Sequence, residues 1–536
     1  MGEGSEAGER GAAPVRVGRA AVWLSAATMI SRVLGLARDQ LFAILIGANR
    51  FSDAFVVAFR IPNLLRDLFA EGALSSAFVP TFAEAQRNEG REAAYRLGNA
   101  VVALILIVVG AITLLGVAFA GPLVHALAPG YAPDQARLAA VLTRIMMPFL
   151  LLVSLSAVAM GMLNAQSRFA APALAPALFN VGSIAVGLGL WAAGWPPERA
   201  VVGWAVGTLV GGLAQLLAQV PSLWQVGYRL RPWVGRGDLA DPRLRRIFRL
   251  MGAAVIGLSA TQVNILVNTI FASLQVGANT WLQFAFRLMQ LPLGVFGVAI
   301  ATVAGAGVAQ RAAARDLAAV KETLGSALRL VAFLNVPCAV GLAILARPII
   351  SLIYEHGRFG AADTDATAQA LIFYALGLYA YSAVKVLAPA FYALNAARVP
   401  VLGSALGMAS NVLLNLALYP VLGFRGVALG TSLAAAANFA VLAFAWKRRH
   451  GGFGPAGLYR QLAKVGLASA VLAAASWAAA RGLSPLRPPG KSLAFQLLLA
   501  FGPIAAGGLA YLTAARALGI RELDELLGAL RRRRAR

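Results

Sequence analysis

Long apolar segments recur along almost the whole chain, separated by short segments rich in Gly, Pro or Arg. A segment of about 20 apolar residues is long enough to cross the hydrocarbon core of a bilayer as a helix. Lipid offers no hydrogen-bond partner to the backbone, so a spanning segment must satisfy its own N–H and C=O groups, which favours helices. The sequence therefore predicts an all-α integral membrane protein. About fourteen transmembrane helices are expected, at residues 19–46, 51–82, 95–121, 135–163, 170–194, 200–226, 246–272, 278–310, 324–354, 366–393, 398–420, 426–446, 460–480 and 493–515.

The composition agrees with this fold class and argues against most enzymes. Hydrophobic residues make up 59% of the chain and charged residues 13%, whereas soluble domains average about 45–50% and about 25%. Cys338 is the single cysteine, so no disulfide forms within the chain, and with three histidines a zinc enzyme is not expected. The sequence lacks a Walker lysine loop, a GxSxG elbow and an HExxH motif. We therefore expect no catalytic residue, metal or cofactor.

The net charge of +25 is explained mainly by membrane topology. Lysine and arginine are concentrated in the loops after even-numbered spans, notably between residues 229 and 249 and at 447–449. Because cytoplasmic loops are enriched in these residues, both termini are expected in the cytoplasm. Residues 1–17 have no apolar core, so we expect a disordered tail and no signal peptide. The basic segment 519–536 is either a topology anchor alone or a contact to anionic lipid worth about 1 kcal/mol per residue.

A faint internal repeat divides the chain. His125, Leu163-Asn164-Ala165 and Asn180 recur in the same order as His356, Leu394-Asn395-Ala396 and Asn411, although so few matches in an Ala-rich chain can also arise by chance. Taken as real, the repeat predicts two six-helix lobes with pseudo-two-fold symmetry plus two extra C-terminal helices. The lobes of such transporters enclose the substrate. The predicted regions are the cytoplasmic tail 1–17, the N-lobe 18–228, the C-lobe 229–450, the last two spans 451–518 and the basic tail 519–536.

Several charged and polar residues fall inside the predicted spans, where each arginine costs about 2.5–3.5 kcal/mol on insertion scales. They must therefore face a wet cavity or paired neighbours rather than lipid. These residues are Ser31, Arg32, Arg38 and Asp39 in the first span, Asp53, Arg60, Asn63, Arg66, Asp67 and Glu71 in the second, Arg287 in the eighth and Lys385 in the tenth.

Helical geometry gathers the polar residues of the second span. From Arg60 to Glu71 they fall on one arc of about 140°, which Pro62 is expected to bend. In the first span, Gly35 is a predicted site of kinking or partial unwinding, which would bring Arg32 and Arg38 to one cavity.

Two interpretations of these charges stay open at this point. Arginine binds phosphate oxygens in a fork, so the cluster fits a diphosphate head group. The alternative is internal salt bridging, as Arg38–Asp39 and as Arg66–Asp67–Glu71. Lys385 has a third possibility, because a lysine near a helix end can snorkel to the interface.

Other polar motifs have simpler explanations. Asp238 and Asp241 form a D-x-x-D motif that resembles a metal pair for diphosphate, but the surrounding arginines favour a salt-bridged loop. Polar residues of the seventh and eleventh spans supply no carboxylate set for sodium and favour helix packing. They are Asn264, Asn268, Asn411 and Asn415.

Several ordered motifs together resemble one family. They are Ser31-Arg32-Val33-Leu34-Gly35-Leu36-Ala37-Arg38-Asp39, Asp53-Ala54-Phe55, Ile61-Pro62-Asn63-Leu64-Leu65-Arg66, Phe69-Ala70-Glu71-Gly72-Ala73, Ala77-Phe78-Val79-Pro80, His356-Gly357-Arg358-Phe359 and Lys385-Val386-Leu387-Ala388-Pro389. On these residues, and along about residues 20–515, the sequence is similar to the MurJ/MviN-type lipid II flippases of the multidrug/oligosaccharidyl-lipid/polysaccharide exporter superfamily.

The resemblance implies a flippase of the bacterial inner membrane that acts in peptidoglycan synthesis, and so in cell-wall biogenesis and cell shape. It would move lipid II, the undecaprenyl-diphosphate-linked disaccharide-pentapeptide, from the inner to the outer leaflet by alternating access. A V-shaped central cavity and a groove for the lipid tail in the last two spans are implied as well. The expected partners are lipid II and membrane lipids, without nucleic acid, and the chain is expected to act as a monomer.

The resemblance also assigns residues. The family's cationic cavity positions correspond to Arg32, Arg38, Arg60, Arg66 and Arg287, and its acidic positions to Asp39, Asp53 and Glu71. One departure is that Phe286 and Gln290 stand where some relatives have acids beside the arginine of the eighth span.

Three further questions stay open. The energy source is either a Na⁺ gradient or the membrane potential. The alternative transport functions are a flippase for another polyprenyl-linked saccharide and a drug or cation exporter, although an exporter of cations should carry more cavity carboxylates than arginines. An enzyme acting on polyprenyl phosphates would have to use Asp238 and Asp241.

Overall fold

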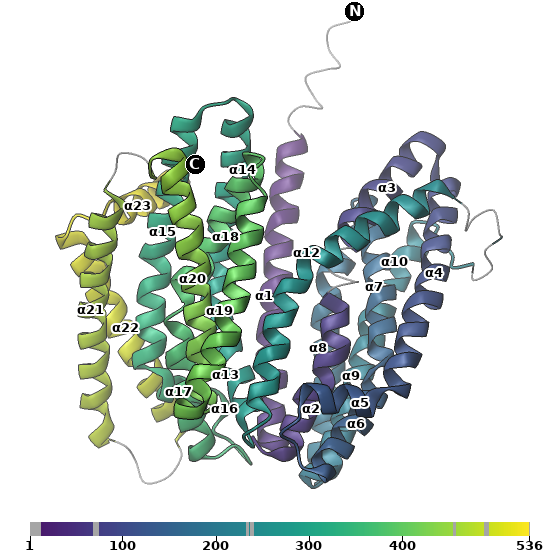
Figure 1. The fold of residues 1–536 in the computed structure, drawn as a ribbon, viewed down its shortest axis with the longest axis horizontal. Coiled ribbons are helices and arrows are strands. Elements are labelled where there is room, and N and C mark those ends of the chain that lie inside the picture. The colour runs from purple at the N-terminus through teal and green to yellow at the C-terminus, as the bar shows by residue number, and fades with distance from the viewer. Residues whose placement is uncertain are drawn as a thin grey trace, which may run out of the picture. The chain divides into compact units, whose positions relative to one another are not determined.

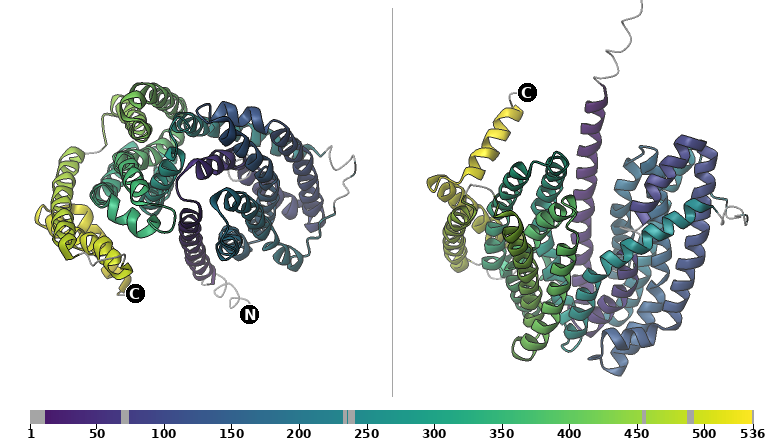
Figure 2. Two further views of the ribbon diagram at one scale, coloured as in Figure 1. Left: turned by 90° about the horizontal axis from the view of Figure 1, so that it is seen from below. Right: turned by 45° about the horizontal axis from the view of Figure 1, so that its top comes forward.

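A computed structural model describes the backbone of residues 12–67, 74–231, 235, 241–453, 457–486 and 492–534. Within these ranges, side chains are described except at 12–25, 75–76, 253–261, 527 and 529–534. The chain folds as two compact units, unit 1 (Met1–Gln262) and unit 2 (Val263–Arg536). Every regular element among the described residues is helical, so the predicted all-α class is confirmed (Figures 1 and 2).

Unit 1 contains ten complete helices and the first part of an eleventh among its described residues. They are α1 (Ala12–Ile46), α2 (Arg50–Arg66), α3 (Leu74–Glu89), α4 (Arg91–Ala118), α5 (Ala120–Leu127), α6 (Pro133–Met146), α7 (Pro148–Ala165), α8 (Ala170–Ala192), α9 (Pro197–Leu217), α10 (Val220–Gln225) and the first part of α12 (Pro242–Ala272).

Unit 2 continues from α12 and is likewise helical wherever it has regular structure in the described ranges. Its elements are α13 (Ala278–Pro292), the π-helix η2 (Leu293–Gly297), α14 (Val298–Ala313), α15 (Leu317–Ile344), α16 (Ala346–Tyr354), α17 (Ala361–Ala375), α18 (Leu378–Ala393), α19 (Arg398–Leu422), α20 (Phe424–His450), α21 (Leu458–Leu483), the 3₁₀ turn η3 (Ser484–Leu486), α22 (Leu493–Ala517) and α23 (Arg521–Arg534).

Several predicted spans are interrupted, among them the fourth, the eighth and the tenth. The fourth consists of α6 and α7, which meet at Met147 just before Pro148. The eighth passes through η2, which directly follows Pro292. Proline lacks the N–H that would continue the helical hydrogen bonds, so these breaks have a local cause. The tenth is the pair α17 and α18, bent by 40°.

Ten helical segments of the described residues are long and apolar enough to cross a membrane, and the bent pair α17–α18 raises the number to eleven. These eleven correspond to the predicted spans other than the first, second and seventh. The first span carries Arg32, Arg38 and Asp39, and the second includes residues 68–73, which lie outside the described ranges. The exact number of fourteen remains a prediction.

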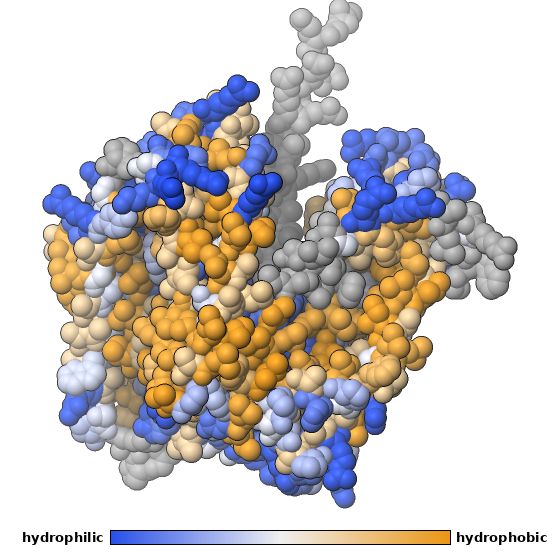
Figure 3. All heavy atoms as spheres, viewed as in Figure 1, coloured by the Kyte–Doolittle hydropathy of each residue, from blue (hydrophilic) through white to orange (hydrophobic). Residues whose placement is uncertain are grey.

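Large apolar side chains are exposed in both units. Leu114 on α4 is 71% exposed, Val303 on α14 75% and Val421 on α19 81%. In Figure 3 the visible face of each unit is hydrophobic along its middle and hydrophilic at its two ends. Such surfaces are unstable in water but match the hydrocarbon core of a bilayer. The predicted membrane-embedded character is confirmed.

Small residues allow close packing next to α1. A Cβ atom at Gly211 of α9 would lie 2.5 Å from the carbonyl oxygen of Phe179 on α8, so only glycine fits there. Helix α8 packs extensively against both α9 and α1. Close approach at small residues is the usual way in which helices associate in lipid. Helix α8 is therefore held by α9 on one side and packs against α1 on another.

Helix α12 belongs to both units, because the boundary between them falls at Gln262, inside the helix. Its first half completes the hydrophobic core of unit 1, where Leu244, Ile247 and Met251 are buried with Phe78 and Phe82 of α3. The two units are thus joined by a helix rather than by a loop. The sequence-based division placed the lobe boundary before this helix, at residue 229.

The C-terminal helix α23 is docked onto unit 2. Ile520 and Leu523 are buried with Phe333 of α15 and with residues of α21 and α22. The Nε atom of Arg329 on α15 donates to Oε1 of Glu522 at 2.8 Å, and the side chains of this pair are only 10% and 3% exposed. Residues 519–536, expected as a basic tail, thus begin with a buried ion pair.

We expect Glu522→Ala to lower the free energy of unfolding by about 3–5 kcal/mol, because it leaves the buried guanidinium of Arg329 without its charge partner. The double variant Arg329→Leu/Glu522→Leu should recover most of this loss, since replacing a buried pair by apolar side chains is often neutral. Thermal unfolding of the purified full-length protein in detergent measures both. Equal melting of Glu522→Ala and the unsubstituted chain would contradict the prediction.

Candidate substrate-binding site

Helix α1 carries the first group of predicted site residues, Ser31, Arg32, Arg38 and Asp39. The predicted unwinding at Gly35 is wrong, because α1 is α-helical from Ala12 to Ile46. Gly35 lies against α8 instead, where a Cβ atom on it would be 3.7 Å from Nδ2 of Asn180. The glycine thus lies at a helix contact and does not break the helix.

Arg38 is held by two neighbours. Its Nη2 and Nε atoms donate to Oδ1 of Asp39 at 3.1 and 3.4 Å. Its guanidinium also lies over the ring of Phe179 on α8, 5.3 Å from the ring centroid. The side chains of Arg38 and Asp39 are 15% and 7% exposed. The predicted salt bridge of this pair is confirmed, and the aromatic contact adds a cation–π attraction.

Helix α2 carries the second group. It begins with a capping box in which Oδ1 of Asn49 accepts from the backbone N–H of Ser52, whose hydroxyl accepts from the backbone N–H of Asn49. This cap fixes the start of the helix at Arg50, three residues before Asp53, which is fully buried in its first turn. A carboxylate there is favoured by the positive end of the helix dipole. Arg60 and Asn63, farther along α2, are partly buried.

At the end of α2, Arg66 is paired with its neighbour. Nη2 of Arg66 donates to Oδ1 of Asp67 at 2.9 Å, and Nε donates to the same oxygen at 3.2 Å. The other carboxylate oxygen of Asp67 accepts from Gln262 at 3.4 Å. The predicted Arg66–Asp67 bridge is therefore confirmed. Glu71, its predicted third member, lies outside the described residues.

The remaining predicted cations belong to unit 2. Arg287 on α13 is partly buried, and Lys385 in the middle of α18 is exposed. Phe286, where some relatives carry an acid, packs edge-on against Tyr374 of α17 with ring centroids 5.3 Å apart. This position therefore serves aromatic packing in the chain.

A chain of aromatic rings, which sequence reasoning missed, runs between the arginine-bearing helices of unit 1. From Phe179, the ring beneath Arg38, it passes to Phe149 of α7 and then to Phe59 of α2, with 5.5 Å between centroids at each step. Phe59 directly precedes Arg60. The chain continues through Phe55, which lies 6.0 Å from Phe59, to Phe42 of α1 at 5.1 Å. Only the spacing of Phe55 and Phe59, one helical turn apart, is visible in the sequence.

Four uncharged polar residues meet inside unit 2. Nδ2 of Asn268 on α12 donates to Oγ1 of Thr431 on α20 at 2.9 Å. Nδ2 of Asn415 on α19 donates to Oδ1 of Asn268 at 2.8 Å, and Asn411 donates weakly to Thr431 at 3.4 Å. These bonds join three helices, which confirms the helix-packing interpretation for Asn268, Asn411 and Asn415. Oδ1 of Asn264 is buried without a hydrogen bond among the described residues.

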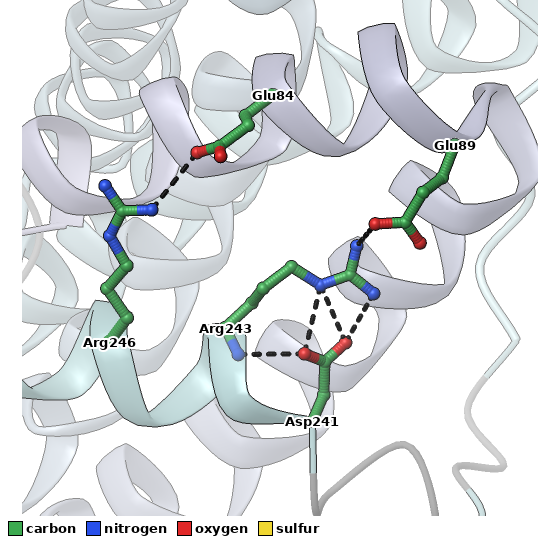
Figure 4. A network of polar contacts seen from close by, with 5 residues as sticks. All are labelled: Glu84, Glu89, Asp241, Arg243 and Arg246. Carbon is green, nitrogen blue, oxygen red and sulfur yellow. Dashed lines mark hydrogen bonds and ion pairs between the residues drawn. The ribbon is translucent and has the colours of Figure 1, made fainter.

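The start of α12 forms an ion-pair network with α3 (Figure 4). Asp241 caps α12, because its Oδ1 atom accepts a hydrogen bond from the backbone N–H of Arg243 at 2.8 Å. Its carboxylate also accepts hydrogen bonds from the guanidinium of Arg243, the shortest at 2.7 Å between Nη2 and Oδ2. Arg243 also donates to Glu89 at 2.6 Å, and Arg246 to Glu84 at 3.1 Å. The hydrogen bonds from Arg243 lower the pKa of the Asp241 carboxyl.

This network borders an open pocket of about 480 Å³ whose lining mixes both signs of charge, from Glu89, Arg96, Asp241 and Arg243. Asp241 is thus a salt-bridged cap, as the surrounding arginines predict. Asp238, the other half of the D-x-x-D motif, lies outside the described residues.

Comparison with known proteins identifies the family. The family model "Lipid II flippase MurJ" matches residues 42–486. The probable lipid II flippase MurJ of Vibrio cholerae is 35% identical over 441 residues, which cover 80% of this chain and 82% of that protein. The lipid II flippase MurJ of Burkholderia cenocepacia is 35% identical over 443 residues, covering 82% and 85%. The probable flippase of Rhizobium meliloti is 33% identical over 515 residues, covering 94% and 95%.

Solved structures agree with this similarity. A lipid II flippase MurJ in an inward closed conformation superposes with a TM-score of 0.75 at 25% identity, covering 92% of this chain and 98% of that one. An inward-facing multidrug resistance MATE family transporter gives a TM-score of 0.66 at 16% identity, covering 80% and 98%, which shows a shared fold alone. By the extent of the family match and the identity to its curated members, the chain belongs to the MurJ family of lipid II flippases.

Proposed function

We propose that the chain is a flippase that moves lipid II from the inner to the outer leaflet of the bacterial inner membrane by alternating access. The observation that carries this proposal is the family match over residues 42–486. The charges of unit 1 support it, because arginines retained on α1 and α2 suit a diphosphate better than they suit a cationic drug. Transport of this kind needs no catalytic residue, so the protein acts as a transporter and not as an enzyme.

The proposed binding residues for the diphosphate and head group are Arg32, Arg38, Arg60, Arg66 and Arg287. Cargo binding would offset the mutual repulsion of these charges and favour the conformation that holds the cargo best. The polar and acidic residues around them would set the local charge balance. These supporting residues are Ser31, Asp39, Asp53, Asn63, Glu71 and Lys385.

The architecture proposed for this function has fourteen spans in two pseudo-symmetric lobes, with the last two spans forming a groove for the polyprenyl tail. Both termini would lie in the cytoplasm, which is supported by the basic loops after even-numbered spans. We propose that the protein works as a monomer, with lipid II and membrane lipids as partners and without nucleic acid.

No cofactor enters the proposed mechanism, and the driving force is either a Na⁺ gradient or the membrane potential. The potential acts on a moving charge with about 2.3 kcal/mol per 100 mV.

Alanine substitutions test the proposed binding arginines. Arg38→Ala and Arg287→Ala should each weaken lipid II binding by about 10- to 100-fold, because a hydrogen bond to a charged group contributes about 1.5–3 kcal/mol. In a bacterium depleted of its own flippase, both variants should fail to restore growth. Arg448→Ala, which removes an exposed arginine at the end of α20, is the matched control and should restore it.

Two outcomes of this experiment separate the claims. If the unsubstituted chain inserts into the membrane yet restores neither growth nor lipid II export, the proposed function is wrong. If it restores both and the two alanine variants do so equally well, the binding-site assignment is wrong while the function stands.

Substitution of the D-x-x-D motif distinguishes a flippase from an enzyme acting on polyprenyl phosphates. Asp238→Asn/Asp241→Asn should retain full lipid II export, because asparagine also caps helices and Arg243 keeps its ion pair with Glu89. Export is measured in the same depleted bacterium, with expression matched to the unsubstituted chain. Complete loss of export in a variant that still inserts would favour the enzyme.

Proteoliposomes distinguish the two driving forces. Collapse of the membrane potential at equal Na⁺ on both sides should stop net lipid II transport if the potential drives it. An imposed Na⁺ gradient without a potential should sustain transport if sodium drives it. Transport that persists when neither is present would contradict both.

A further inference from the structure

One buried amide, that of Asn180 on α8, lies beside the site residues of α1. Asn180 is 6% exposed. Its Nδ2 donates to the backbone carbonyl of Ser31 on α1 at 3.1 Å, and also to the carbonyl of Pro176, one turn earlier on α8, at 3.2 Å. Asn180 is therefore a hydrogen-bonded link between α8 and the residue that immediately precedes Arg32.

The residue next to Asn180 contacts Arg38, the second of the two predicted site arginines of α1. The ring of Phe179 lies beneath the Arg38 guanidinium, 5.3 Å from centroid to Cζ. Two consecutive residues of α8 thus hold α1 at two points, its backbone at Ser31 and its side chain at Arg38. Gly35 lies between these points, and a Cβ atom on it would lie 3.7 Å from Nδ2 of Asn180, so α8 is close to α1 along this stretch.

The support behind these two residues is rigid. The carbonyl of Phe179 lies so close to Gly211 of α9 that a Cβ there would overlap it, and its ring packs on Phe149 of α7 at 5.5 Å. Helix α8 therefore presents Asn180 from a fixed position.

The register of α1, meaning its position along and around its own axis relative to α8, determines where its arginines lie. A slip of α1 by one residue would shift each arginine by about 1.5 Å and turn it by about 100° around the helix axis. A guanidinium binds phosphate through two parallel hydrogen bonds, which demand a defined position. A directional hydrogen bond to the α1 backbone fixes that register, whereas apolar contacts alone tolerate sliding.

We propose that Asn180, supported by Phe179, is a positioning residue that sets the register of α1 and thereby places Arg32 and Arg38 for the diphosphate of the cargo. This inference rests on the proposed function, since it takes the two arginines as cargo-binding groups. Asn180 itself does not contact the cargo. Its loss reduces affinity through the arginines.

The test uses the purified full-length chain in detergent and undecaprenyl diphosphate as the probe. Asn180→Leu keeps the side-chain size and removes both donors. We expect its dissociation constant to rise about 3- to 10-fold, the worth of one or two hydrogen bonds. Phe179→Leu should raise it about two- to tenfold by removing the aromatic face. In a lipid II transport assay, Asn180→Leu should raise the half-saturating concentration while its maximal rate stays within about twofold, because the hydrogen bond affects cargo binding alone.

Ser183→Ala is the matched control, because it removes hydrogen bonds from the same helix to the carbonyls of Phe179 in α8 and Gly207 in α9 rather than to α1. It should bind the probe as the unsubstituted chain does. Asn180→Gln, which keeps the amide donor, should recover part of the lost affinity. If Asn180→Leu does not fold, the dissociation constants of Phe179→Leu and Asn180→Gln test the proposal instead.

The experiment distinguishes a failure of this inference from a failure of the proposed function. If the unsubstituted chain does not bind undecaprenyl diphosphate, the proposed function fails. If it binds and a folded Asn180→Leu binds equally well, the positioning role is overturned. The role is equally overturned if Ser183→Ala weakens binding as much as Asn180→Leu, because the effect would then be a general loosening of α8.

Discussion

The burial of charge in an apolar environment governs this structure, because a guanidinium among apolar helices must find a partner or a wet surface. The chain meets this requirement in two ways. In unit 1, Arg38 and Arg66 are each paired with the aspartate that follows them in sequence. In unit 2, Arg329 is paired with Glu522, which lies far away in the chain. The first kind of pair belongs to one helix, whereas the second joins two helices.

This difference matters for how each pair can act. A pair between adjacent residues does not by itself link two helices, and its members reach other helices through further contacts, Arg38 to Phe179 of α8 and Asp67 to Gln262 of α12. The position of α1 must then come from elsewhere, and the structure provides it through Asn180, Phe179 and the rings behind them. The Arg329–Glu522 pair restricts two helices directly, and it holds α23 against α15.

Sequence reasoning succeeded where a property is local. Apolar runs predicted the eleven segments that meet the criteria for spanning, and adjacency predicted the Arg38–Asp39 and Arg66–Asp67 bridges. It failed where the outcome depends on a distant neighbour. Gly35 was expected to unwind α1, but its role depends on Asn180, and nothing near Glu522 in sequence indicates that its partner is Arg329. The helix breaks at Pro148 and Pro292 were also missed, because the mean hydropathy of a span does not show that a proline lacks the backbone N–H.

Helix α12 has a consequence for how the protein is made. Leu244, Ile247 and Met251 complete the core of unit 1, but they lie in a helix whose second half belongs to unit 2. During synthesis, the first unit cannot complete its hydrophobic core when only the described helices that precede α12 have emerged. It has to wait for α12, by which time the ribosome has already begun the second unit. Until α12 is made, Phe78 and Phe82 of α3 lack these three core partners, and a chain that ended before α12 would never gain them.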